Sequence, residues 1–273
     1  IGGDDGARWL SKERRFEGDV CIIGDGNGGG IAHPCIDLGC KGGVRTKLIA
    51  HGKTAHGSSP YLGDNAITKL MKAIPWVERI SEYQLELPDE MENLIAGTMN
   101  FHLNTDNLTA EQEEEMKHSL HHPSVTCNII KGGVRINVVP DYAEAEFDIR
   151  LTPGSKPLKV KDKIEELIRE AGIPGVEVSV KSLNTAGYYE SPDLPFAGQL
   201  ADTVQRITGN IPTLKFLMGG TDALSIKHYI GTPCLGYGAS MTGQAHQPDE
   251  RNTIENLVVA AKVYAAFPLA YKG

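Results

Sequence analysis

Residues 125–151, VTCNIIKGGVRINVVPDYAEAEFDIRL, contain the pattern that decides the fold. Residues 125–130 form an apolar run that ends at the turn Gly132-Gly133, and residues 143–151 alternate apolar and charged side chains. Such alternation is typical of a strand that buries one face and exposes the other. The stretch therefore predicts two consecutive strands joined through a glycine turn.

Two further strands and two helices surround this pair. Residues 44–50 and 176–183 also alternate as strands do. Residues 64–82 repeat apolar side chains at steps of three and four, although Pro75 should kink or shorten that helix. Residues 157–171 predict a second helix, because a proline stands near its start and a glycine just past its end.

The order of these elements predicts an inserted domain. Residues 43–184 give strand, helix, an irregular excursion, strand, strand, helix and strand, which is the split βαβ order of ferredoxin-like domains. The flanking segments contain predicted strands at 19–24 and 234–237 and predicted helices at 196–208 and 253–267. We therefore expect an α/β mixed-sheet domain, formed by residues 1–42 and 185–273, that an α+β domain of residues 43–184 interrupts.

Composition excludes several classes of protein. A formal net charge of -8 over 273 residues argues against a nucleic-acid-binding surface, which would carry a basic stripe. No run approaches the roughly 18 apolar residues of a membrane span. The five cysteines are odd in number and include no C-x-x-C pair, which argues against a disulfide framework and favours a reducing, cytoplasmic location.

The glycine-rich turn GDGNGG, residues 24–29, allows three interpretations. It matches the dinucleotide pattern G-x-G-x-x-G, but that pattern needs a following helix, and Gly30, Pro34 and Gly39 argue against one. Asp25 could instead bind a metal through oxygen at the end of a sheet strand. It could also simply bond its own backbone in the turn, which local sequence alone favours.

Several other polar positions have both a functional and an ordinary interpretation. His56 could donate a hydrogen bond to developing negative charge or be an ordinary surface histidine. Asn137 and Arg150 could hold a carboxylate or merely keep strand edges soluble. The turn at Gly220-Thr221 could contact a ligand, whereas Asp222 could cap a helix. His246 could ligate a metal. The spacing of three histidines resembles a metal site in an irregular region: His118, His121 and His122.

Together, the motifs resemble one family of zinc metallopeptidases. The family includes acetylornithine deacetylase, succinyl-diaminopimelate desuccinylase, carboxypeptidase G and the carnosine-type dipeptidases. The resemblance runs over nearly the whole chain, in order. The motifs are GDGN (24–27), GKTAHGSSPYLGDNAI (52–67), KGGVRINVVPDYAEAEFDIR (131–150), MGGTDA (218–223) and AHQPDE (245–250).

The resemblance implies a zinc-binding α/β domain with an inserted lid that also forms a homodimer. It implies two divalent ions, zinc or else cobalt or manganese, with Asp25 as a terminal ligand of one and His246 of the other. His56 matches the lid histidine that reaches the neighbouring subunit's active site and stabilises the oxyanion. The positions implied to bind a small amino-acid-like substrate are Lys41, Asn137, Arg150, Gly220 and Thr221.

The chain also departs from the family's pattern. The family needs an upstream H-x-D motif, a bridging aspartate and a Glu-Glu pair that supplies the general base. Residues 1–7 resemble the family's segment immediately after that pair, so we expect these groups to precede Ile1 and the 273 residues alone to be inactive. The alternatives are a dipeptidase or carboxypeptidase of the same family and a non-catalytic dimeric protein that binds amino acids.

Overall fold

The computed structural model describes residues 6–15, 17–26, 30–182, 186–241, 243–245 and 247–272. They form two compact units. The first contains residues 1–41, 87–118 and 187–273, and the second contains residues 42–86 and 119–186. The sequence-based boundaries, which assign residues 43–184 to one domain, stay a prediction. None of the helices that the structure describes is both long and apolar enough to cross a membrane.

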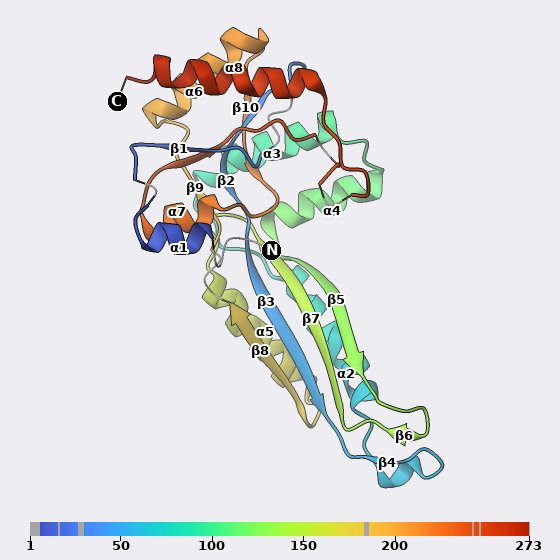
Figure 1. The fold of residues 1–273 in the computed structure, drawn as a ribbon. Coiled ribbons are helices and arrows are strands. Elements are labelled where there is room, and N and C mark those ends of the chain that lie inside the picture. Colours follow the sequence, from blue (N-terminus) through green and yellow to red (C-terminus); the bar gives the residue numbers. More distant parts are fainter. Residues whose placement is uncertain are drawn as a thin grey trace. The chain divides into compact units, whose positions relative to one another are not determined.

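The second unit contains a four-stranded antiparallel sheet in the order β5-β7-β3-β8. Its strands are β3 (Gly42–His51), β5 (Ser124–Gly132), β7 (Tyr142–Leu151) and β8 (Val176–Ser182). Helices α2 (Ala66–Glu78) and α5 (Pro157–Ala171) pack on one face of this sheet and against each other (Figure 1). The predicted ferredoxin-like order is therefore confirmed.

Three details of this unit follow from its sequence. Helix α5 has the predicted bounds, and Gly172 ends it with φ 59°, a conformation that glycine adopts without strain. Pro75 lies inside α2, which ends three residues later and continues as the 3-10 helix η2 (Arg79–Glu82). Two short strands, β4 (Ala55–His56) and β6 (Val138–Val139), pair with each other beyond the end of β3. The 3-10 helix η1 (Pro60–Leu62) follows β4 in the chain.

The first unit contains a mixed sheet in the order β1-β11-β2-β10, and β9 pairs with β2. Its strands are β1 (Cys21–Ile23), β2 (Cys35–Cys40), β9 (Tyr188–Tyr189), β10 (Thr213–Leu217) and β11 (Cys234–Gly236). Its helices are α1 (Ala7–Lys12), α3 (Met91–Thr105), α6 (Pro195–Thr208), α7 (Ala223–Tyr229) and α8 (Ile254–Ala270), and most of α4 (Ala110–His121) also belongs to it. A mixed α/β fold is thus present.

The excursion at residues 84–123, where the sequence shows no clean pattern apart from one acidic helical stretch, forms helices α3 and α4. Helix α3 packs against β10, the edge strand of the mixed sheet. A Cβ atom added to Gly97 would lie 2.1 Å from the carbonyl oxygen of Leu214. The backbone N–H of Phe216 donates to Thr98 Oγ1 at 3.1 Å. The threonine side chain thus takes the hydrogen bond that the carbonyl of a further strand would otherwise accept. The helix therefore covers a sheet edge that would otherwise stay open.

We expect Gly97→Ala to destabilise the first unit, because the added methyl group has no room between α3 and β10. The loss should be about 1–3 kcal/mol of unfolding free energy, the usual cost of overpacking. Gly198→Ala is the matched control, since Gly198 lies exposed inside α6 with nothing within 4 Å of an added Cβ. The control should keep or gain stability, as alanine favours a helix interior. Urea unfolding measures both variants, and equal stability of the two would contradict this packing.

Candidate functional site

Asp25 lies exposed on the turn that follows β1. The segment after β11 packs against this turn: Tyr237 N–H donates to the carbonyl of Ile23 at 2.9 Å. A Cβ atom at Gly238 would lie 2.3 Å from the carbonyl oxygen of Gly24. Only glycine fits at position 238. The close approach of Gly238 to Gly24 fixes the backbone of the turn that carries the exposed Asp25.

A buried ion pair lies behind the turn. Lys215 of β10 donates to Asp37 Oδ1 of β2, and their side chains are 1% and 4% exposed. The other carboxylate oxygen, Oδ2, has no hydrogen-bond partner among the described residues, and it lies 2.9 Å from where a Cβ of Gly26 would be. Burial raises the pKa of Asp37, against the opposing effect of the Lys215 charge. Charged residues inside the apolar runs CIDLGC and TLKFL were the signal for this pair, which sequence reasoning missed.

The described residues do not by themselves fit a metal ion. Nowhere in the described ranges do three His, Cys, Asp or Glu side chains come together as ligands, so His118, His121 and His122 form no metal site there. His246, the other predicted ligand besides Asp25, lies outside the described residues. Because zinc takes about four ligands, the side chains in the described ranges are too few to hold one on their own.

His56 and Asn137 come together at one end of the second unit. His56 pairs with Val138 across β4 and β6, and Gly57 N–H donates to the carbonyl of Asn137 at 2.8 Å. The N–H of Ser58 donates to His56 Nδ1 at 3.2 Å, and the Ser58 hydroxyl lies 2.7 Å from the same atom. Since Nδ1 accepts, a neutral His56 ring carries its proton on Nε2. Both His56 and Asn137 are exposed, so this N–H is available to a ligand.

Arg150 lies at the opposite end of the same sheet. It pairs with Gly43 near the start of β3, whereas Tyr142 pairs with His51 at the end of β3 near the β4–β6 ribbon. The eight residue-to-residue steps from Gly43 to His51 span about 27 Å at the rise of an antiparallel strand. The structure therefore does not bring Arg150 together with Asn137. The Arg150 guanidinium donates to Asp148 Oδ2 from Nη2 at 2.8 Å and from Nε at 3.1 Å. These two bonds do not use its Nη1 group.

The remaining predicted substrate-binding residues lie in the first unit. Gly220 is exposed and Thr221 half-buried in the turn before α7, where Thr221 Oγ1 accepts from the N–H of Ala223 at 3.3 Å. Asp222 occupies the N-cap position of α7 but makes no side-chain cap bond. The Lys41 side chain is buried, with 1% of the residue exposed. The backbone N–H of Lys41 donates to the carbonyl of Leu217 at 2.9 Å.

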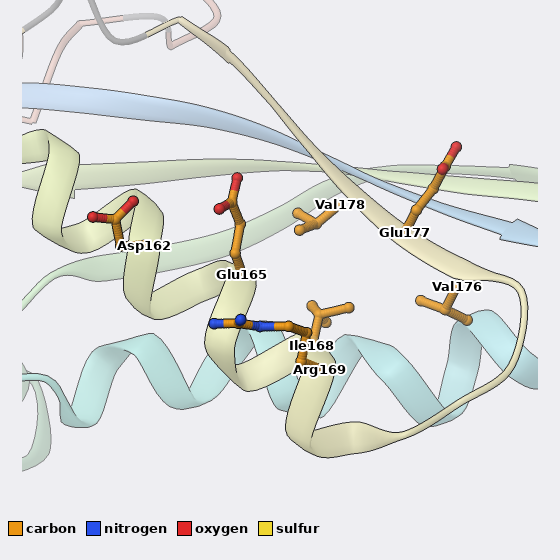
Figure 2. A pocket seen from close by; sticks show the side chains of 7 residues that line it. All are labelled: Asp162, Glu165, Ile168, Arg169, Val176, Glu177 and Val178. Atoms are coloured by element: carbon orange, nitrogen blue, oxygen red, sulfur yellow. The ribbon is translucent and has the colours of Figure 1, made fainter.

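The glycine turn does not lead into a helix: residues 30–34 turn into strand β2. This order agrees with rejecting the dinucleotide interpretation. A groove of about 440 Å³ between α5 and β8 contains none of the predicted site residues. Asp162, Glu165 and Glu177 line it together with Arg169 and apolar side chains (Figure 2). Asp162 and Glu165 pair with Lys161, and Glu177 pairs with His51, so all three carboxylates already have partners.

Comparison with known proteins places these features in a family. The family model described as "Peptidase dimerisation domain" matches residues 38–176. A succinyl-diaminopimelate desuccinylase of Corynebacterium glutamicum is 26% identical over 260 residues, which is 95% of this chain and 58% of that protein. The chain belongs to the M20 family of peptidases, whose dimerisation domain it carries.

Solved structures of M20-type enzymes share the fold. The M20 family metallo-carboxypeptidase Sso-CP2 of Sulfolobus solfataricus aligns with a TM-score of 0.70 and 20% identity, over 96% of this chain and 65% of that one. The di-peptidase Dug1p of Saccharomyces cerevisiae aligns with a TM-score of 0.73 and 17% identity, over 97% and 62%. The chain thus spans about three-fifths of the length of these relatives.

Proposed function

We propose that the whole protein is a metal-dependent amidohydrolase that removes an acyl group from a small N-acyl amino acid. The relatives named succinyl-diaminopimelate desuccinylase support this substrate class, and the dipeptidase and carboxypeptidase among the similar structures define the alternative. The proposed cofactors are two divalent metal ions, zinc or else cobalt or manganese, with Asp25 and His246 among the ligands. All these substrates share the reacting amide, so their selection depends on contacts around it.

The distance between His56 and Arg150 carries the proposal for the site. Arg150 pairs with Gly43 near the start of β3, whereas His56 follows the end of β3, which lies about 27 Å further along that strand. A small substrate cannot contact both residues within one copy of the chain. Two copies can supply them to one substrate. We therefore propose a composite site in which Arg150 comes from one subunit, and His56 and Asn137 from the other.

Each of these residues has a chemical role that suits its surroundings. The Nε2–H of His56 would donate to the oxyanion that forms as the amide carbonyl is attacked. The unpaired part of the Arg150 guanidinium would hold the substrate carboxylate, a geometry that arginine favours. Asn137 would donate to the same end of the substrate as His56. Gly220 and Thr221 would contact its amino-acid portion.

The edge strand β5 offers a surface on which two copies could meet. It is an end strand of the sheet, and its Ile129 and Ile130 are 43% and 61% exposed. Met71 on the neighbouring helix α2 is 67% exposed. An unpaired strand edge beside exposed apolar side chains readily joins a second sheet. We propose that the homodimer forms here.

We expect His56→Ala in the whole, metal-loaded protein to lower turnover about 100- to 1000-fold, the usual effect of losing one oxyanion donor. Metal content should stay unchanged. The assay uses whichever N-succinyl amino acid, N-acetyl amino acid or dipeptide of a panel is turned over fastest. The matched control is His51→Ala, because His51 is an exposed histidine of the same unit that pairs with Glu177. Wild-type turnover in His56→Ala would reject the role.

Co-expression of His56→Ala with Arg150→Ala tests whether the site is composite. Mixed dimers contain one site with both residues intact only if the two residues act from different subunits. Activity should therefore reappear in the mixture, although each variant alone is nearly inactive. A mixture as inactive as its components would show that the residues act within one subunit.

We expect Ile130→Glu to separate the homodimer into monomers, because a charge on the β5 edge cannot be buried against a second copy. Leu158→Glu is the control, because Leu158 is as exposed as Ile130 (62% against 61%) but lies on α5 and not on the β5 edge. Light scattering coupled to size-exclusion chromatography should give half the wild-type mass for Ile130→Glu and the wild-type mass for Leu158→Glu. A dimeric Ile130→Glu protein would contradict this interface.

A further inference from the structure

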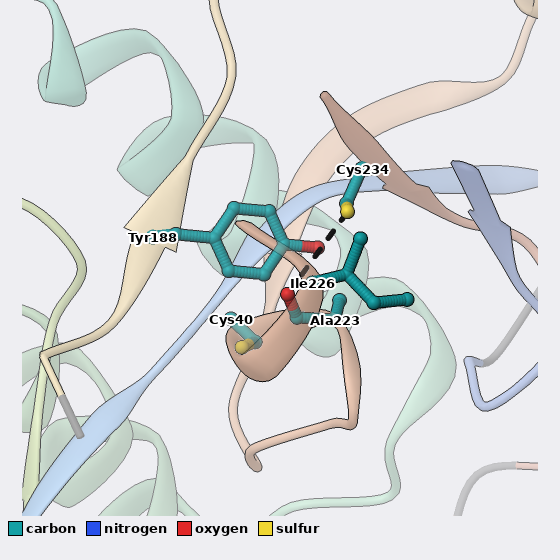
Figure 3. Packing of buried hydrophobic residues seen from close by; sticks show 5 residues of the cluster. All are labelled: Cys40, Tyr188, Ala223, Ile226 and Cys234. Carbon is teal, nitrogen blue, oxygen red and sulfur yellow. Dashed lines mark hydrogen bonds between the residues drawn. The ribbon is translucent and has the colours of Figure 1, made fainter. Parts of the chain in front are cut away.

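Two cysteine thiols face each other on neighbouring strands of the first unit. Cys21 of β1 and Cys234 of β11 are register partners in a parallel pair, and their side chains hydrogen-bond to each other. Cys234 belongs to a buried cluster with Cys40, Tyr188 and Ala223 (Figure 3). Cys21 packs against this cluster. All five cysteines are reduced in the structure.

The two thiols differ in access and acidity. Cys21 is half-buried, and the hydrogen bond from Cys234 lowers its pKa against the opposing effect of burial. Cys234 is fully buried, and the same hydrogen bond and burial raise its pKa. Its Sγ also lies 3.3 Å from the carbonyl oxygen of Thr232. The reachable thiol is thus the better nucleophile, and its neighbour holds a proton.

We propose that Cys21 and Cys234 are an oxidisable thiol pair, in which a hydroperoxide first oxidises Cys21 and Cys234 then closes a disulfide between β1 and β11. The Cys21 thiolate attacks one peroxide oxygen, the O–O bond breaks, and the protonated leaving oxygen departs as water or an alcohol. Cys234 sulfur then attacks the sulfenic sulfur of Cys21, and the S–O bond breaks. Water leaves with the Cys234 proton, so two electrons pass from the thiols to the peroxide.

The disulfide would act on the turn that carries Asp25. A disulfide would fix the two Cβ atoms about 3.8 Å apart and so tie β1 covalently to β11. Strand β1 runs directly into the turn, and Gly238, which follows β11, packs against it. Among the other cysteines, burial raises the pKa of both Cys35 and Cys40, and Cys127 lies on β5 in the second unit.

The test treats the reduced chain with hydrogen peroxide, blocks remaining thiols with N-ethylmaleimide and digests it without reductant. Mass spectrometry should find a peptide linked through Cys21 and Cys234, with loss of two of the five thiols in each chain. The link should vanish in 6 M urea, where the strands no longer align. Oxidation of Cys21 to sulfinic acid without a link, or a first link through Cys127, would overturn the proposal.

Variants separate the two steps. Cys234→Ser should accumulate a Cys21 sulfenic acid that dimedone traps, because the second thiol is gone. Cys21→Ser should leave Cys234 unoxidised, because Cys234 is buried. Cys127→Ser, which changes another partly buried cysteine, should form the link as the wild type does. An unchanged rate of thiol loss in Cys21→Ser would contradict the assignment, and the wild-type peptide map decides the matter if a variant fails to fold.

Discussion

A buried ion pair between Asp37 of β2 and Lys215 of β10 constrains the first unit, because neither charge can be removed alone without leaving the other unpaired. Both charges have lost their water, so each depends on the other to offset a desolvation cost of several kcal/mol. The Lys215 ammonium also lies 4.8 Å from the centre of the Phe101 ring of α3, a favourable cation–π contact. One cation thus joins two parallel strands to the helix that covers the sheet edge. The free oxygen of Asp37 lies against Gly26, so the same pair supports the turn that presents Asp25.

Local patterns predicted the second unit well. In the first unit they predicted β1, β11, α6 and α8 but missed β2, β10 and α3. The alternation in residues 143–151 and the proline and glycine that bound residues 157–171 depend only on neighbours in sequence, and both elements formed as predicted. Strand β2 is buried on both faces, so it shows no alternation, and it contains a charge that only Lys215, 178 residues away, makes tolerable. Helix α3 contains a glycine that is explained only by its contact with β10. Tertiary partners, which periodicity does not reveal, determine these elements.

The candidate site shows the same division. The sequence predicted Asp25 on the turn after a strand and His56 on an exposed loop. The structure places Asp25 on an exposed turn and His56, also exposed, within the short strand β4. The separation of Asn137 from Arg150 depends on the register of β3 and β7, which sequence motifs do not specify. The strand register that aligns two cysteines 213 residues apart is equally hidden from the sequence. The family's motifs therefore identify the candidate site residues. Strand pairing determines which of these residues one copy of the chain can bring to a single substrate.

The most direct test of the ion pair is a double-mutant cycle with Asp37→Leu, Lys215→Met and both together, measured by urea unfolding. In a Trp76→Phe background, Trp9 fluorescence reports on the first unit, because Trp9 lies in that unit and Trp76 in the other. Each single change should lower the unfolding free energy by about 3–5 kcal/mol, since it leaves one buried charge unpaired. The double change should lower it by less than either single change. Losses that simply add in the double variant would contradict the central role of this pair.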